Sequence, residues 1–121
     1  MFGNLKERSL DDRRNVSNGL LVRYPDRIPV IVDRPTASRF GRRESIPPID
    51  KQKYLVPADL TMAKFMQEIR RHIAINSQQS LFLFVNGFLL PNSDPIGAVY
   101  RRHRDPDGFL YVTYTTENTF G

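Results

Sequence analysis

Apolar residues form several short runs along the chain that predict β-strands. Residues 28–32 are mostly β-branched, which is typical of a buried strand. Because Pro29 cannot donate a hydrogen bond to a neighbouring strand, we expect it at the start of this strand or at a bulge. Residues 53–56 predict a second strand that ends at Pro57, and the apolar alternation over residues 109–114 predicts the last strand.

The strongest local signal between these strands is a hairpin. Residues 81–85 and 88–90 are largely apolar, and the dipeptide Asn86-Gly87 separates them. Asparagine and glycine both tolerate the positive φ angles that a two-residue hairpin turn requires. The sequence therefore predicts two antiparallel strands joined at this dipeptide. A further turn is expected at the Asp-Pro-Asp-Gly sequence of residues 105–108.

One long segment has the spacing of an amphipathic helix. Thr61 is a suitable N-cap, because its hydroxyl can accept a hydrogen bond from the first turn. After it, apolar residues recur every three or four positions, with lysine, glutamine and arginine between them. These residues are Met62, Phe65, Met66, Ile69 and Ile73. We expect most of this stripe to pack in the core.

Two further helices are predicted, one before the first strand and one before the last strand. Asp94-Pro95 resembles an N-cap followed by proline at the first helical position, before an apolar set around Val99. Residues 1–22 predict a weaker helix in which Ser9 resembles an N-cap. A weak helix of this kind forms only when it packs on the rest of the chain. Its apolar residues that could share one side are Leu10, Val16, Leu20 and Leu21.

The order of these elements predicts an α+β fold. Strand, strand, long helix, strand, short helix and strand give a mixed sheet with the long helix on one face, which is the ubiquitin-like β-grasp plan with a helical N-terminal extension. We expect three parts: a helical extension at residues 1–23, a ubiquitin-like domain at residues 24–115 and a flexible tail at residues 116–121. Within the domain, residues 35–50 are rich in proline and charge and predict an extended loop.

Composition and charge narrow the function. The 121 residues suit one domain with a single core. All of the net charge of +5 arises in residues 1–43, which hold ten basic and five acidic residues. This excess either forms a basic surface for an acidic partner or simply solvates the protein. Nucleic acid is not expected as a partner, because no run of five like charges and no nucleic-acid motif occurs.

The residues that usually carry catalysis are missing or scattered. The chain contains no cysteine, which excludes disulfides, thiolate metal sites and a cysteine nucleophile. No serine elbow, phosphate loop, nucleotide fingerprint or paired metal ligands are present. His72 and His103 are expected at the surface. We therefore expect no enzymatic activity, catalytic residue, metal or cofactor. The chain also has no signal-peptide pattern, which fits a cytoplasmic protein.

Four strings of residues are similar to those of a known family. They are Tyr-Pro-Asp-Arg-Ile-Pro-Val-Ile-Val at 24–32, Lys-Tyr-Leu-Val-Pro-Ala-Asp-Leu-Thr at 53–61, Phe-Val-Asn-Gly at 84–87 and Phe-Leu-Tyr-Val at 109–112. In this order they resemble the autophagy ubiquitin-like modifiers, the GABARAP and light-chain-three family.

The resemblance implies conjugation of a C-terminal glycine to the amine of phosphatidylethanolamine on autophagosomal membranes. Carried onto this chain, the conjugated residue is Gly121, and Phe120 agrees with the bulky residue that commonly precedes it. Activating and conjugating enzymes would carry the glycine as a thioester on their own cysteines, and a cysteine protease would process or deconjugate the protein. The implied locations are the cytoplasm and, after conjugation, the autophagosomal membrane. The unconjugated chain is expected to be a monomer.

The resemblance also implies recognition of autophagy receptors through peptides with an aromatic-x-x-aliphatic motif. Residues 53–56 would accept such a peptide as an added strand if they lie at a sheet edge. The implied aromatic pocket comprises Val16, Leu20, Pro29, Lys53, Leu55 and Phe109. The implied aliphatic pocket comprises Tyr54, Val56, Pro57, Leu60, Phe65 and Ile69, of which the last three fit a core helix stripe equally well. Acidic residues beside the motif would meet Arg27, Lys51 and Arg70.

Two features depart from the family pattern. The loop at residues 35–50 is about half a dozen residues longer than expected, and we interpret it as a tolerated surface insertion. Glu68 occupies a helix position at which the family usually has an apolar pocket residue.

An alternative interpretation of the whole chain is an unconjugated ubiquitin-fold adaptor. It would bind acidic protein or microtubule surfaces through its basic N-terminal third.

Overall fold

The computed structural model describes residues 5–36 and 45–118. In chain order, its elements are η1 (Leu5–Glu7), α1 (Leu10–Arg23), β1 (Arg27–Asp33), β2 (Lys53–Pro57), α2 (Met62–Arg70), β3 (Gln79–Val85), β4 (Phe88–Leu89), α3 (Ile96–His103) and β5 (Leu110–Asn118). Phe120 and Gly121 lie outside the described residues, and the predicted loop at residues 35–50 is described only in part.

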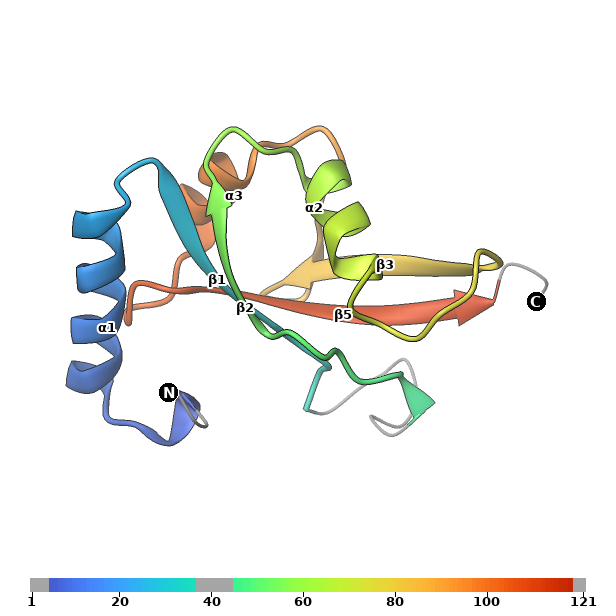
Figure 1. The fold of residues 1–121 in the computed structure, drawn as a ribbon, viewed down its shortest axis with the longest axis horizontal. Coiled ribbons are helices and arrows are strands. Elements are labelled where there is room, and N and C mark those ends of the chain that lie inside the picture. The colour runs from blue at the N-terminus through green and yellow to red at the C-terminus, as the bar shows by residue number, and fades with distance from the viewer. Residues whose placement is uncertain (1–4, 37–44, 119–121) are drawn as a thin grey trace.

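A five-stranded sheet with the order β2-β1-β5-β3-β4 organises the molecule (Figure 1). β1 pairs antiparallel with β2 and parallel with β5, and β3 pairs antiparallel with both β5 and β4. The sheet is therefore mixed, and the predicted α+β architecture is confirmed. β2 and β4 form its two edges.

The core lies between the sheet and α2 and α3, which stand above the sheet in Figure 1. The helix predicted after Thr61 is confirmed, and the Thr61 hydroxyl accepts from the N–H of Lys64 at 3.3 Å. Of its apolar stripe, Met62, Phe65, Ile69 and Ile73 are buried, and half-buried Met66 packs against the same cluster. Because α2 ends at Arg70, Ile73 lies beyond the helix. The most enclosed core side chains include Val30, Val32, Met62, Phe65, Ile69, Leu83, Val85, Ile96, Val99, Leu110, Val112 and Tyr114.

The hairpin is also confirmed. Asn86 and Gly87 have φ angles of 52° and 82°, and Val85 pairs with Phe88 across the turn.

The prediction that Asp94 caps α3 is wrong, since Pro95 is the N-cap and has no side-chain cap hydrogen bond. Residues 94–95 lie beside the start of α2 and pair with it through main-chain hydrogen bonds, so α3 begins one residue later.

Pro29 lies neither at a strand start nor at a bulge. It pairs regularly with Leu55 inside β1, whereas the pairing of β1 with β5 begins only at Val30. At this antiparallel position the main-chain N of Pro29 points away from β2. The missing N–H therefore removes no hydrogen bond from either ladder.

The inward face of α1 is centred on a polar residue. Ser9 caps the helix as predicted, with its hydroxyl accepting from Asp12 N–H at 3.1 Å. Ser17 is fully buried, whereas Leu10 is 38% exposed, so Leu10 does not join the predicted apolar side. The Ser17 hydroxyl donates to the main-chain oxygen of Asp107 at 2.5 Å. Polar contacts to the turn after α3, rather than an apolar stripe, therefore fix the orientation of α1.

Gly108 in this turn leaves no room for a side chain beside α1. Its φ is +89°, and an added Cβ would overlap the Ser17 hydroxyl. We predict that Gly108→Ala lowers the free energy of unfolding by about 3 kcal/mol, from left-handed strain plus overpacking. Urea unfolding followed by circular dichroism measures this.

Gly87→Ala is the matched control, because Gly87 has φ +82° with nothing within 4 Å of an added Cβ. It should cost only the strain of roughly 1–2 kcal/mol. Equal losses for the two variants would contradict a close contact between Gly108 and Ser17.

Candidate functional site

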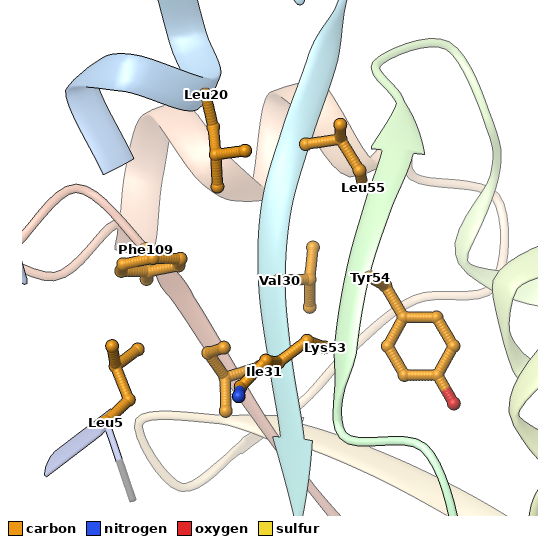
Figure 2. A pocket seen from close by; sticks show the side chains of 8 residues that line it. All are labelled: Leu5, Leu20, Val30, Ile31, Lys53, Tyr54, Leu55 and Phe109. Atoms are coloured by element: carbon orange, nitrogen blue, oxygen red, sulfur yellow. The ribbon is translucent and has the colours of Figure 1, made fainter. Parts of the chain in front are cut away.

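An apolar hollow of about 140 Å³ lies beside the edge strand β2 (Figure 2). It lies on the sheet face opposite α2, because Lys53 and Leu55 line it whereas Tyr54 and Val56 point into the core. Figure 2 shows Leu20 descending from α1, with Leu5 and Phe109 at the left and the Lys53 and Leu55 side chains on the β2 side. Its lining residues are Leu5, Leu20, Val30, Ile31, Lys53, Tyr54, Leu55 and Phe109.

The hollow contains four of the six residues predicted for the aromatic pocket. These are Leu20, Lys53, Leu55 and Phe109, whereas Val16 and Pro29 are not among its lining residues. Pro29 is buried and Val16 is half-buried.

The sequence interpretation missed Leu5 and Ile31. Strand alternation could have found Ile31, because it shares a face of β1 with Pro29. Leu5 is only 5% exposed, and no local pattern in the sequence indicates this contact. Val30 and Tyr54 belong to the core on the other face, so they border the hollow through their main chain.

The size and lining of the hollow suit one aromatic ring. Apolar cavities of about 150 Å³ bind benzene. Phe109, which is 3% exposed, forms part of the wall in Figure 2. A ring that enters would be removed from water by apolar side chains on most sides, which is favourable by roughly 25 cal/mol per Å² of buried apolar surface.

The main chain of β2 provides a second binding element. Val32 N–H donates to Gln52 O at 2.7 Å, and Ala58 N–H donates to Asp26 O at 3.0 Å, which fixes the hydrogen-bonding pattern between β1 and β2. By alternation, the N–H and C=O groups of Lys53 and Leu55 point away from β1, toward the outer edge. Arg27 already uses this edge, because its guanidinium donates to Leu55 O at 3.1 Å.

The residues predicted for the aliphatic pocket lie together but are mostly closed in the core. Val56, Phe65 and Ile69 are at most 4% exposed, and the Tyr54 ring meets the Phe65 ring edge-on at 5.4 Å. Only Pro57 and Leu60 of this set are half-buried. The gap between β2 and α2 must therefore widen before an aliphatic side chain can enter.

Basic residues lie beside the hollow. Burial and the nearby Arg8 guanidinium both lower the pKa of Lys53. Arg8 was not predicted for the site. Lys51 lies on the α2 side of β2 and not at the hollow, because its ammonium is 5.0 Å from the centre of the Tyr54 ring, which packs against Phe65. Arg70 is not part of this group, because its guanidinium donates to main-chain oxygens of Asn76 and Gln79 at the start of β3.

Acidic residues lie on the α2 side of the same strand. The His72 ring contacts Asp50 at 2.7 Å and lies 3.8 Å from Glu68. Burial, together with these two carboxylates, raises the pKa of the Tyr54 hydroxyl. The predicted aliphatic pocket is therefore bordered by the Glu68 and Asp50 carboxylates and the His72 imidazole. Position 68 thus carries a charge where the resemblance implies an apolar side chain.

Residues 5–36 and 45–118 contain no group of three or more histidine and acidic side chains arranged to hold a metal ion. None of the helices in the same ranges is long and apolar enough to cross a bilayer.

The fold is similar to that of a solved autophagy protein. The crystal structure of Trypanosoma brucei ATG8 matches with a TM-score of 0.80, covering 94% of this chain and 93% of that one at 32% identity. The mixed sheet with α2 on one face, together with this similarity, defines a ubiquitin-like protein with an N-terminal helix, as the sequence predicts.

Sequence relatives identify the family. Autophagy-related protein 8 of Dictyostelium discoideum is 47% identical over 93% of this chain and 88% of its own length. Autophagy-related protein 8c of Arabidopsis thaliana is 44% identical over 95% and 92%. The family described as "Autophagy protein Atg8 ubiquitin like" matches residues 12–121. The chain therefore belongs to the Atg8 family of autophagy ubiquitin-like modifiers, which confirms the resemblance found in its sequence.

Substitution of Leu20 tests whether an aromatic ring binds in the hollow. We predict that Leu20→Ala weakens the binding of free indole about fivefold, because it removes apolar contact from one wall. Titration followed by NMR shifts of Ile31 and Phe109 measures this. Leu10→Ala is the matched control, a leucine on the same helix outside the lining. Equal effects of the two substitutions would show that the ring binds elsewhere.

Proposed function

We propose that the protein is an autophagy modifier that recruits receptors to a membrane. It is conjugated through Gly121 to phosphatidylethanolamine and binds aromatic-x-x-aliphatic peptides at β2. The observation that carries the peptide part is the apolar, ring-sized hollow beside an edge strand. Family membership carries the conjugation part, since the family match extends to residue 121.

Peptide capture would begin with strand addition. An extended peptide would hydrogen-bond to the outward main-chain groups of Lys53 and Leu55, and its aromatic side chain would enter the hollow. Arg27 would then release the Leu55 oxygen and become available to an acidic residue of the peptide. Lys53 and Arg8 add positive charge beside the same edge, and charge of this kind mainly increases association rate and selectivity.

The second anchor would require a local rearrangement. Three residues along β2 from the aromatic position, an aliphatic side chain would reach the gap between β2 and α2. Half-buried Pro57, Leu60 and Met66 are the apolar groups able to move there without opening the whole core. Because Glu68 and Asp50 lie beside this gap, we expect the aliphatic anchor to contribute less affinity than the aromatic one.

Conjugation would use Gly121 as an acyl donor. The amine of phosphatidylethanolamine would attack the thioester that joins Gly121 to a cysteine of the conjugating enzyme. An amide would form, and the thiol would leave. Glycine suits this step because it has no Cβ to hinder the acyl carbon. Partners in this cycle would be the activating and conjugating enzymes and a cysteine protease, and the protein would pass as a monomer from the cytoplasm to the autophagosomal membrane.

The unconjugated adaptor receives less support. Several arginines of the basic N-terminal third make contacts within the protein instead of forming a free basic arm. Arg13 lies 3.7 Å from the Asp107 carboxylate, Arg14 donates to Pro106 O at 3.1 Å, and Arg34 donates to Ile46 O at 3.2 Å.

The conjugation proposal predicts a band shift. With activating and conjugating enzymes, ATP and phosphatidylethanolamine liposomes, the protein should give a faster-migrating lipidated form on gels. Gly121→Ala should reduce this form at least about tenfold, because the added methyl group hinders the acyl carbon. Undiminished conjugation of Gly121→Ala would overturn the assignment, and circular dichroism checks that both proteins are folded.

The peptide proposal predicts which residues change their NMR signals when a peptide binds. Titration with an aromatic-x-x-aliphatic peptide should perturb the NMR signals of β2, Ile31 and Phe109. Arg27→Ala should weaken binding of an acidic-flanked peptide about threefold, the scale of an exposed charge contact. Arg23→Ala is the control, since Arg23 is exposed at the end of α1. Perturbations confined to residues 35–50 would argue against the β2 groove.

A further inference from the structure

A polar hollow of about 410 Å³ lies between α1 and the turn that joins α3 to β5. This α1–α3 hollow is lined by Arg14, Asn18 and Leu21 of α1, by Tyr100 and Arg104 at the end of α3, and by residues 105–108 of the turn. The three α1 residues are four and three positions apart, so they share one face of the helix. None of the lining residues belongs to the aromatic hollow beside β2, so the two hollows are separate.

Two arginines hold their guanidinium groups at the α1–α3 hollow. Arg14 is positioned because its Nε–H donates to Pro106 O at 3.1 Å, which leaves its terminal N–H groups for another acceptor. The Arg104 guanidinium lies 5.9 Å from the centre of the Tyr100 ring. Among residues 5–36 and 45–118, no carboxylate forms an ion pair with either arginine. Two cationic groups thus line one hollow without anionic partners.

The carboxylates of the same hollow already have partners. Asp107 is fully buried, and its carboxylate accepts hydrogen bonds from Phe109 N–H and the Tyr111 hydroxyl. Arg13 lies 3.7 Å from the same carboxylate. Asp105 accepts from the N–H of Asp107 at 3.0 Å. Together with Arg13, the lining holds three arginines and two aspartates, an excess of one positive charge. The charge therefore favours an anionic ligand.

We propose that the α1–α3 hollow binds a phosphorylated serine of a partner protein. The phosphate of phosphoserine carries a charge of about −1.5 to −2 at neutral pH and has three acceptor oxygens. It accepts hydrogen bonds from the guanidinium groups of Arg14 and Arg104, and the exposed Asn18 amide adds a neutral donor. Arginine suits this role because its planar fork of donors matches the geometry of phosphate oxygens. The hollow is larger than one phosphate group, so main-chain groups beside the phosphoserine enter as well.

The position of the hollow favours a protein partner over the lipid bilayer. β5 begins two residues after Gly108 of the lining, and its nine residues end at Asn118. At about 3.3 Å per residue, the strand extends roughly 27 Å. Figure 1 accordingly shows α1 and the end of β5 at opposite ends of the molecule. If Gly121 is joined to a lipid, as proposed above, the hollow faces away from the bilayer. The choice of partner rests on that proposal, whereas the charge of the hollow does not.

The test uses the unconjugated full chain and a capped peptide of sequence Gly-Ala-Ser-Ala-Gly in which the serine is phosphorylated. This peptide lacks the aromatic residue that the β2 site requires. Its titration should shift the NMR signals of Asn18, Arg104 and residues 105–108. The unphosphorylated peptide should give no such shifts. A peptide with glutamate in place of phosphoserine should bind about fivefold more weakly, because it offers less charge and fewer acceptor oxygens.

Two outcomes of this titration would contradict the phosphoserine site. One is the absence of shifts at the hollow up to several millimolar phosphopeptide. The other is equal binding of the phosphorylated and unphosphorylated peptides. Gly121→Ala should bind the phosphopeptide as the unchanged chain does, so a failure of conjugation and a failure of this site can be told apart.

Substitutions locate the bound phosphate. Arg14→Ala and Arg104→Ala should each weaken the phosphopeptide about fivefold through loss of a charged donor. Arg23→Ala on α1 and Arg102→Ala on α3 remove the same charge outside the lining and should leave binding unchanged. Similar losses in both pairs would indicate general attraction to a basic protein and overturn the proposal.

A further substitution keeps the contact between Arg14 and the turn. Asn18 is exposed and lies in the lining, so Asn18→Asp adds a negative charge there without removing an arginine. It should weaken the phosphopeptide about fivefold by repulsion, with an unchanged circular dichroism spectrum. Undiminished binding by this variant would place the phosphate elsewhere.

A lipid headgroup is tested separately. Phosphatidylcholine vesicles containing phosphatidylinositol 4-phosphate carry a phosphate monoester on a bilayer. They should not displace the phosphopeptide from the unconjugated protein, as followed by the NMR signals of Asn18 and Arg104. Displacement by these vesicles, but not by vesicles of phosphatidylcholine alone, would assign the hollow to a lipid headgroup and overturn the choice of a protein partner.

Discussion

The buried carboxylate of Asp107 holds the N-terminal helix on the sheet, and the aromatic hollow depends on this contact. The carboxylate accepts hydrogen bonds from the N–H of Phe109 and the hydroxyl of Tyr111, and Arg13 lies 3.7 Å away. Burial and the hydrogen bond from Tyr111 to Asp107 raise the pKa of the Tyr111 hydroxyl, which therefore remains a donor at neutral pH. Because a buried charge is costly without its partners, α1 cannot leave this position cheaply. Leu20 is thereby held across the hollow from Phe109.

β2 serves two purposes because its side chains alternate. Tyr54 and Val56 point into the core and attach the strand to α2, whereas Lys53 and Leu55 face the hollow. The same alternation directs the main-chain groups of Lys53 and Leu55 to the open edge. For the proposed peptide binding, a rigid core would present this edge with little further ordering, which would reduce the entropy lost on binding. The aliphatic position lacks this advantage, since Phe65 and Ile69 are fully enclosed.

Local sequence patterns predicted most of the fold and part of the site. The hairpin and the long helix are specified by features that span only a few residues, so they can be recognised in the sequence. These features are Asn86-Gly87, the N-cap Thr61 and the stripe from Met62 to Ile69. Lys53, Leu55, Leu20 and Phe109 were predicted through resemblance, and they do line one hollow. Val16 and Pro29 were expected there and do not line it. Leu5 and Arg8 were missed, because their positions depend on how the segment of residues 5–8 lies against β1 and β2.

The sequence by itself determined the elements, the order that makes the sheet mixed, and the family. These properties depend on periodicity, turn residues and short strings, all of which are local. Only the tertiary structure decided that Ser17 and Asp107, rather than leucines, anchor α1, because the burial of a polar pair depends on partners 90 residues apart in the chain. It also decided that the aromatic hollow is open while the aliphatic gap is closed. Whether an apolar side chain lines a cavity or fills the core depends on packing between elements, which no periodicity records.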